Sequence, residues 1–218
     1  MRALASLGEL LFPRKCVLCM GLLKKNETDF CTACRAKAPV FPGSTRSFPY
    51  VAEWTALWLY EDMVRSSLLR FKFRGKQSYA AAYGRMLAME LQKAGMTFDL
   101  LTWVPVSARR RFCRGYDQVG LLARALGREL GIKPQRTLRK VRHTPAQSTL
   151  SGAEQRKANV LGAYRVVNPR ALQGKRVLLL DDIITTGATL SECARTLEAA
   201  GAARVLGASV AAGRNRTK

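Results

Sequence analysis

The segment VLLLDDIITTGATL, residues 177–190, contains the pattern that decides the fold of this chain. Its first four residues, 177–180, have the length and composition of a buried central strand. Asp181 and Asp182 follow the apolar run, a loop with three threonines and Gly187 comes next, and a helical pattern begins near residue 190. Parallel α/β sheets bind ligands at the carboxyl ends of their strands, so we expect a ligand site here.

The same segment has the features of a site for a phosphorylated sugar. Gly187 allows the backbone to approach a ligand closely, and the N–H groups of the next helix's first turn attract anions. Asp181 and Asp182 cannot bind phosphate, but they can accept hydrogen bonds from vicinal hydroxyls such as those of a ribose. The alternative, in which both carboxylates only cap the helix, is weaker because adjacent carboxylates without partners are costly.

The rest of the chain alternates helical and strand patterns. Apolar strands that alternate with helices indicate a mostly parallel sheet covered by helices on both faces. We place a cap at Asp117 and a helix end at Gly131 for the third helix. Helices are expected at residues 61–73, 79–94, 119–130 and 190–200, and strands at residues 98–106, 163–167, 177–180 and 205–211.

Four of the six cysteines have the spacing C-x2-C-x11-C-x2-C. This spacing offers four thiolates to a tetrahedral Zn²⁺, and a set made only of cysteine predicts a structural ion rather than a catalytic one. Two disulfides or a redox pair are the alternatives. The four ligands are Cys16, Cys19, Cys31 and Cys34. Residues 35–50, rich in proline, are read as a linker after this module.

Charge is the strongest feature of the composition. The 218 residues include 37 Lys and Arg against 15 Asp and Glu, a formal net charge of +22. Residues 101–150 hold 11 of these cations and only 2 of the acids. Nucleic acid and phosphorylated small molecules are the expected partners, and a basic surface without a specific partner is the alternative.

Length and hydropathy exclude other classes. A chain of this size suits one domain with a small module attached. No apolar stretch approaches the roughly 18 residues that a membrane span needs. The N-terminal twelve residues lack a signal-peptide cleavage pattern, so we expect a cytoplasmic protein.

The basic residues after the expected strand at residues 98–106 form a second candidate site. Because they follow the carboxyl end of a buried strand, we expect them to face the same crevice as Asp181. Guanidinium groups there would clamp a diphosphate, whereas a solvated basic loop is the alternative. The residues concerned are Arg109, Arg110, Arg111 and Arg114.

The segment 177–190 closely resembles the phosphoribosyl-diphosphate (PRPP) motif of type I phosphoribosyltransferases. In that family two acidic residues bind the ribose hydroxyls and a T-T-G-x-T loop surrounds the 5′-phosphate. The resemblance implies that Asp181 and Asp182 are the catalytic pair. It also implies PRPP contacts from Asp181, Asp182, Thr185, Thr186, Gly187, Ala188 and Thr189.

More narrowly, the chain resembles the ComF (competence protein F) family, in which a four-cysteine zinc ribbon precedes a phosphoribosyltransferase-like domain. Residues 104–111, which include Ser107, resemble the family's strand and diphosphate loop, and residues 114–118 resemble its R-G-[FY]-[ND]-Q signature. A third pattern falls on Gln147, Leu150, Arg156 and Asn159. The resemblance implies a zinc ribbon at residues 1–42 and a phosphoribosyltransferase-like domain at residues 43–218.

Two functions follow as hypotheses. The first is a PRPP-binding enzyme in which Mg²⁺ and arginines stabilise the diphosphate that leaves the anomeric carbon. The second is a protein that handles single-stranded DNA in natural transformation, together with other competence proteins, and uses PRPP only as a ligand. Aromatic side chains near the basic stretches would then stack on bases, and these are Phe71, Phe73, Phe112 and Tyr116.

Three details narrow these hypotheses. Thr185 stands where some purine-using members of the superfamily have a carboxylate, so we do not expect purine salvage. Residues 139–155 are expected to form a lid over the crevice. His143, the only histidine, is not assigned as a base.

Overall fold

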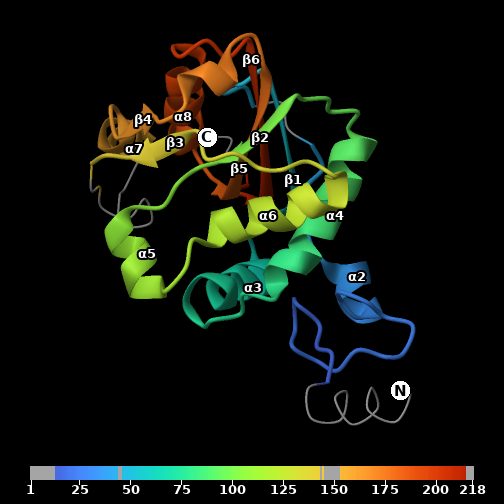
Figure 1. The fold of residues 1–218 in the computed structure, drawn as a ribbon. Coiled ribbons are helices and arrows are strands. Elements are labelled where there is room, and N and C mark those ends of the chain that lie inside the picture. Colours follow the sequence, from blue (N-terminus) through green and yellow to red (C-terminus); the bar gives the residue numbers. More distant parts are fainter. Residues whose placement is uncertain (1–12, 44–45, 143, 145–152, 215–218) are drawn as a thin grey trace, which may run out of the picture.

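The computed structural model describes residues 13–43, 46–142, 144 and 153–214 (Figure 1). Its centre is a sheet of four parallel strands in the order β1-β6-β5-β2. This arrangement confirms the prediction of a parallel α/β sheet. The strands are β1 (Glu53–Leu59), β2 (Leu100–Trp103), β5 (Arg176–Ile184) and β6 (Arg204–Ala212).

Helices cover both faces of this sheet (Figure 1). The helix expected at residues 119–130 forms as predicted, because Asp117 accepts the N–H of Gly120 at 3.0 Å and Gly131 ends it with a φ of 68°. The helices are α2 (Thr32–Lys37), α3 (Asp62–Phe73), α4 (Tyr79–Lys93), α5 (Ala108–Arg114), α6 (Gln118–Leu130), α7 (Ala153–Val160) and α8 (Ala188–Glu198).

Strand β5 lies inside the sheet, hydrogen-bonded to β2 on one side and β6 on the other. Leu178 and Leu180 pack into the core formed with α3, α4 and α6, while Val177 and Leu179 pack into the core formed with α8. All four side chains are fully buried. A strand covered on both faces must be apolar throughout, which explains the unbroken run in the sequence.

Three elements differ from the expectations. Residues 163–167 do form a strand, β4 (Tyr164–Val166), but it pairs antiparallel with β3 (Leu138–Lys140) in a separate small sheet. The diphosphate loop expected after residue 106 is largely the helix α5. Strand β1 was not predicted, although the apolar run from Ala56 to Leu59 is a usable signal.

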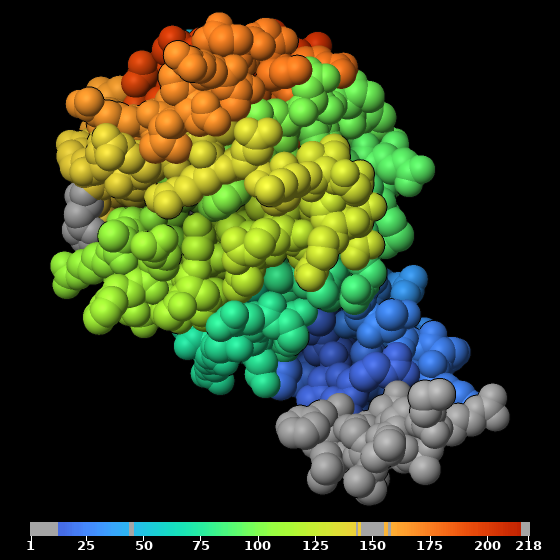
Figure 2. Space-filling model, viewed as in Figure 1, coloured from blue at the N-terminus to red at the C-terminus, as the bar shows by residue number. Residues whose placement is uncertain are grey.

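The N-terminal part packs directly against α3 and α4. Ser67 and Arg70 of α3 donate hydrogen bonds to the carbonyl oxygen of Val17, and Arg85 of α4 pairs with Asp29. Figure 2 shows these N-terminal residues, in blue, against α3 in teal.

Residues 35–50 are more than a linker, because part of this segment pairs with β1. The N–H of Phe41 donates to the carbonyl oxygen of Leu57, and the N–H of Leu59 donates to that of Pro39. The segment is therefore fastened to the edge of the sheet.

None of the helices in the described part of the chain is both long and apolar enough to cross a bilayer.

Candidate functional site

Asp181 and Asp182 lie within strand β5, which continues to Ile184, rather than after its end as the sequence suggested. Asp182 is 5% exposed. One of its carboxylate oxygens, Oδ1, lies 2.8 Å from the Nζ of Lys72, at the end of α3. The other, Oδ2, accepts a hydrogen bond of 3.0 Å from Nε2 of Gln118, the first residue of α6. Asp182 is therefore held in place by two elements on one face of the sheet.

Asp181 has a different environment. Its Oδ1 accepts the backbone N–H of Asp182 at 2.8 Å. Burial and the neighbouring charge of Asp182 raise the pKa of Asp181 to about 8, against the opposing influence of Lys72 and Lys140. The Asp181 carboxyl is therefore partly protonated near neutral pH in the free site, so it can both donate and accept hydrogen bonds.

The turn after β5 presents the start of helix α8. Gly187 precedes the helix with a φ of 74°, a left-handed conformation that favours glycine. A Cβ atom at this position would lie 2.2 Å from the ring of Phe48. The ring therefore packs directly against the turn at Gly187. Gly187 has no side chain to cap the first N–H groups of α8, which suits an anion at this helix end.

The side chain of Arg46 holds the same turn by donating hydrogen bonds to backbone carbonyl oxygens. Its Nη1 donates to the carbonyl oxygen of Thr185 at 2.7 Å, and its Nη2 donates to that of Gly213 at 2.8 Å. The guanidinium also lies over the rings of Phe48 and Trp54. The predicted phosphate-binding residues Thr185, Thr186, Gly187, Ala188 and Thr189 thus lie together on one turn with a defined support.

The predicted arginine clamp is divided between two sides of helix α5. Arg110 and Arg114, four residues apart, share the inner side. Arg110 Nη2 donates to the carbonyl oxygen of Thr144 at 3.1 Å. Arg114 lies over the ring of Phe73 at 4.7 Å and close to Asp182, and burial lowers its pKa.

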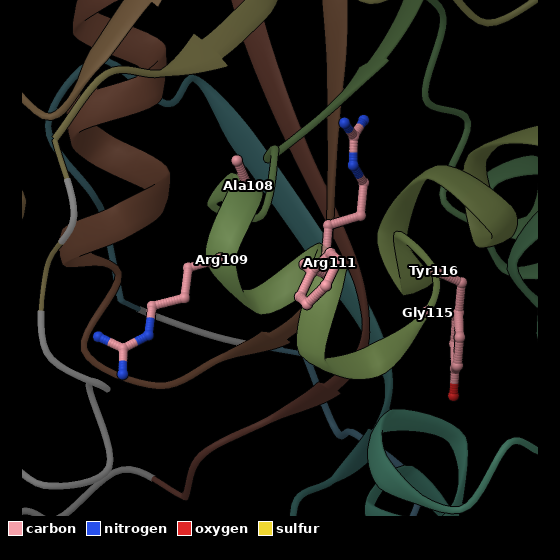
Figure 3. A pocket seen from close by; sticks show the side chains of 6 residues that line it. Ala108, Arg109, Arg111, Gly115 and Tyr116 are labelled. Atoms are coloured by element: carbon pink, nitrogen blue, oxygen red, sulfur yellow. The ribbon is translucent and has the colours of Figure 1, made fainter.

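The other two arginines of the expected clamp lie on the outer surface. Arg109 and Arg111 line a hollow of about 620 Å³, in which their side chains point in different directions (Figure 3). Phe112, in the same hollow, is 91% exposed. The hydroxyl of Ser107 caps α5 by accepting a hydrogen bond from the backbone N–H of Arg110. Helix α5 therefore begins at the edge of the site.

A half-buried lysine, Lys140, was not among the residues predicted for the site. Lys140 on β3 donates to Oγ1 of Thr144 at 2.7 Å, and its ammonium lies 5.2 Å from the centre of the Tyr164 ring. Burial, together with the charge of Arg110, lowers the pKa of Lys140 to about 8, and the ammonium is close enough to Asp181 to affect its titration. No local pattern marks this lysine, because β3 is three residues long.

Part of the expected site lies outside the described residues. This applies to His143, Gln147 and Leu150, and to most of the lid expected at residues 139–155. Among the described residues of this stretch, Arg142 donates to the carbonyl oxygens of Asn159 and Leu161. Arg156 lies on α7.

The four N-terminal cysteines converge as the spacing predicted. Their Sγ atoms all lie within 4.8 Å of one another, and those of Cys19 and Cys31 are 3.8 Å apart. Four sulfurs about 2.3 Å from a tetrahedral Zn²⁺ would have about this separation, so the residues fit the ion. Burial and the neighbouring thiols raise the pKa of Cys34 when no metal is present. The N–H of Gly21 also points to the sulfur of Cys19.

Comparison with known proteins agrees with this architecture. The phosphoribosyl transferase domain family matches residues 120–218. Competence protein F of Haemophilus influenzae is 28% identical over 87% of this chain and 93% of its own length. These matches support assignment of the chain to the ComF family. Competence protein ComFC of Bacillus subtilis is also 28% identical, over 84% of this chain.

Other similarities cover less of each protein. The DNA utilization protein YhgH of Salmonella typhi is 37% identical, but the match spans 62% of this chain and 61% of YhgH. Among solved structures, the glutamine PRPP amidotransferase of B. subtilis superposes on 64% of the chain with a TM-score of 0.43 and 23% identity.

Proposed function

We propose that the site at the end of β5 binds PRPP together with Mg²⁺. The observation that carries the proposal is the succession of a carboxylate pair, the half-buried Asp181 and the buried Asp182, and a helix start without a side-chain cap a few residues later. The carboxylates would accept hydrogen bonds from the ribose hydroxyls, and residues 185–189 would surround the 5′-phosphate. Arg110, Lys140 and Ser107 stand where the diphosphate would extend.

Mg²⁺ would enter with the ligand rather than occupy a prepared protein site. In the described part of the chain, the four cysteines are the only group of three or more potential ligands close together. Asp181 and Asp182 supply oxygen atoms of the kind Mg²⁺ prefers, while the diphosphate would supply the others. Bound there, the ion would neutralise charge that develops on the leaving diphosphate.

The reaction supported by this geometry is displacement of diphosphate at the anomeric carbon. The protein's part is electrostatic: Arg110 and Lys140 stabilise the departing anion, and the carboxylates face the ribose as it gains positive charge. We further propose that the cysteines hold a structural zinc ion in a module at residues 1–42, attached to a phosphoribosyltransferase-like domain at residues 43–218 in the cytoplasm.

Calorimetric titration with PRPP and Mg²⁺ tests the binding claim. We expect one PRPP per wild-type chain and loss of measurable binding in the Asp181→Asn, Asp182→Asn double variant. Glu129→Gln is the matched control, because Glu129 is an exposed acid on α6 away from the site. Unchanged PRPP affinity in the double variant would remove the assignment.

Single-stranded DNA is a second candidate ligand, and a specific surface favours it. Of the four aromatic residues considered for stacking, Phe71 and Tyr116 are buried, which corrects the expectation for them. Phe112 is 91% exposed beside Arg109 and Arg111, and α5 has no acid in its first turn. An exposed ring flanked by guanidinium groups suits stacked bases and a phosphate backbone. The ComF and YhgH relatives named for competence and DNA utilization support this candidate.

Binding of labelled single-stranded DNA across a salt series tests that surface. Phe112→Ala should weaken binding about tenfold or more without changing the salt slope, since stacking carries no counterion release. Arg109→Met should reduce the magnitude of the slope of log affinity against log salt concentration by about 0.7. Phe112→Tyr, which keeps the ring, should bind as the wild type. Equal affinity of Phe112→Ala and wild type would exclude this surface.

A further inference from the structure

The carboxylate pair of β5 has cations on both sides. Residues adjacent on a strand point to opposite faces, and the contacts follow this rule. Asp182 pairs with Lys72 and lies close to Arg114. On the other side of the strand, Arg110 and Lys140 both donate hydrogen bonds to Thr144. The site therefore has two basic clusters, which we call the Asp181 side and the Asp182 side.

The two sides differ in the ligand groups that they can bind. The assignment of these groups rests on the proposed function. In an in-line displacement at the anomeric carbon, the attacking group approaches one face of the sugar while the leaving group departs from the opposite face. The Asp181 side has two cations and the start of α5 at Ser107, which suits a diphosphate. The Asp182 side is then left for the acceptor.

The Asp182 side combines a cation with an aromatic surface. Arg114 is half-buried, and among the described residues no carboxylate forms an ion pair with it. Asp117, the other acid near it, already accepts hydrogen bonds from Gly120 and from Nε1 of Trp103. Desolvation of a cation is costly unless an anion compensates for it. The ring of Phe73 beneath Arg114 remains 61% exposed, although it is a large apolar group.

A buried acceptor atom points to a ligand at the same place. Gln118 is 3% exposed and donates through Nε2 to Asp182. Its Oε1 is buried and has no hydrogen-bond partner among the described residues. A buried carbonyl oxygen without a donor is uncommon in folded proteins. A ligand N–H on the Asp182 side would satisfy it.

We propose that the acceptor substrate is a planar nitrogen ring that carries a negative charge, such as a ring carboxylate. The ring would stack against Phe73 and Arg114, its anionic group would pair with Arg114 and Lys72, and a ring N–H would donate to Gln118. In the transfer, the anomeric C–O bond to diphosphate breaks and its electron pair leaves with the diphosphate. The acceptor nitrogen forms the new C–N bond and releases its proton to water.

Two matched probe pairs test this preference directly. Orotate is uracil with an added carboxylate, and imidazole-4-carboxylate and imidazole-4-carboxamide differ in a carboxylate against a neutral amide; all four rings carry an N–H. Equilibrium dialysis against full-length protein with saturating PRPP and Mg²⁺ should give at least one acid that binds about tenfold or more tightly than its neutral partner, the effect of one charged hydrogen bond. PRPP affinity is measured separately on the same samples.

Three variants locate the preference. Arg114→Met and Lys72→Met should each reduce the acid-to-neutral affinity ratio. Arg114→Met should change PRPP affinity less than threefold or so, whereas Lys72→Met also releases Asp182 and should weaken PRPP binding. Phe73→Ala should weaken both members of a pair and leave their ratio unchanged, because stacking acts on the ring alone. Lys76→Met removes an equal charge from an exposed position four residues beyond Lys72 and should change nothing. The ratio is independent of the folded fraction, so it remains informative if a variant is unstable.

The outcomes separate this inference from the function on which it rests. Failure of the wild type to bind PRPP removes the proposed function itself. If PRPP binds, the inference is overturned by neutral rings that bind as well as their acids, by binding of neither, or by a ratio that survives both cation variants. A large loss of PRPP affinity in Arg114→Met would instead assign the Asp182 side to the diphosphate.

Discussion

Asp181 and Asp182 are neighbours in sequence but lie in different surroundings. Asp182 is fixed by Lys72 and Gln118, so its charge is compensated before any ligand arrives. Among the described residues no cation makes such a direct contact with Asp181, and its pKa rises to about 8 through burial and through Asp182. The two carboxyl groups therefore have different surroundings, which suits different roles around one sugar.

The raised pKa of Asp181 predicts how stability depends on pH. An unfolded Asp releases its proton near pH 4, whereas the folded site holds that proton until about pH 8. The native state therefore loses stability as pH rises from about 4 toward 8, and loses no more above that range. Asp181→Asn should remove this dependence.

Chemical denaturation of the wild type and Asp181→Asn at pH 5, 6.5 and 8 measures the effect. The variant should gain unfolding free energy relative to the wild type as pH increases. Glu129→Gln, on the exposed side of α6, should keep a constant difference from the wild type. A difference for Asp181→Asn that is the same at all three pH values would show that Asp181 is ionised throughout.

At the scale of elements, the turn between β5 and α8 depends on a contact between distant parts of the chain. Gly187 and Phe48 are separated by more than a hundred residues, yet a Cβ atom on Gly187 would overlap the Phe48 ring. Gly187→Ala therefore combines an unfavourable left-handed φ with a steric overlap, and it should cost about 2–4 kcal/mol. The displaced turn should also weaken PRPP binding.

A double-variant cycle separates the two costs. Gly174 has a φ of 65° and nothing within 4 Å of the position its Cβ would take, so Gly174→Ala measures the φ cost alone, about 1 kcal/mol. Combining Gly187→Ala with Phe48→Ala should cost less than the sum of the two single changes, because the overlap is gone. Strict additivity in thermal unfolding would mean that the ring does not restrain the turn.

Elements whose ends are set by interactions within a few residues of the chain were predicted from the sequence. Asp117 and Gly131 marked the ends of α6 because caps are made within a few residues of the chain. Helix α5 was missed because none of its residues is buried, so it has no apolar period to detect. Its one usable signal was Ser107 as a cap.

The site was predictable where the residues are contiguous and not where the fold assembles them. Residues 181–189 form one stretch, so their pattern by itself indicates a phosphate and a sugar. Lys72, Lys140 and Arg46 reach the same place from three other elements. Their contacts depend on long-range packing, to which a single sequence gives no direct guide. The division of the arginines between two sides of α5 has the same origin.

At the scale of the whole molecule, the cysteine cluster and the proposed PRPP site share helix α3. Arg70 donates to the carbonyl oxygens of Val17 and Leu18, next to Cys16, and two residues later Lys72 contacts Asp182. Cys16 and Cys34 belong to the same buried core as Leu68 and Phe71. Loss of a structural metal should therefore disturb the site through α3.

Metal removal tests this connection. We expect about one zinc per purified chain by elemental analysis, and dialysis against a strong chelator should lower both the thermal midpoint and the PRPP affinity. Restoring Zn²⁺ should restore both, while Mg²⁺ should not restore the midpoint. Zinc-free protein with an unchanged midpoint and full PRPP affinity would show that the module and the site are independent.

The basic residues near the site that contribute to the net charge of +22 fall into two groups. Arg110, Arg114 and Lys140 are half-buried, whereas Arg109 and Arg111 are exposed on the outer side of α5. A small ligand with three phosphates accounts for Arg110 and Lys140, and the proposed acceptor anion accounts for Arg114. The second group is the part of the charge that a longer polyanion would use.

A crystal structure of the protein grown with PRPP and Mg²⁺ tests the central claim most directly. We expect the 5′-phosphate within hydrogen-bond distance of the backbone N–H groups at residues 186–189, and the ribose hydroxyls against Asp181 and Asp182. PRPP bound elsewhere, or a carboxylate pair that makes no contact with the sugar, would contradict it.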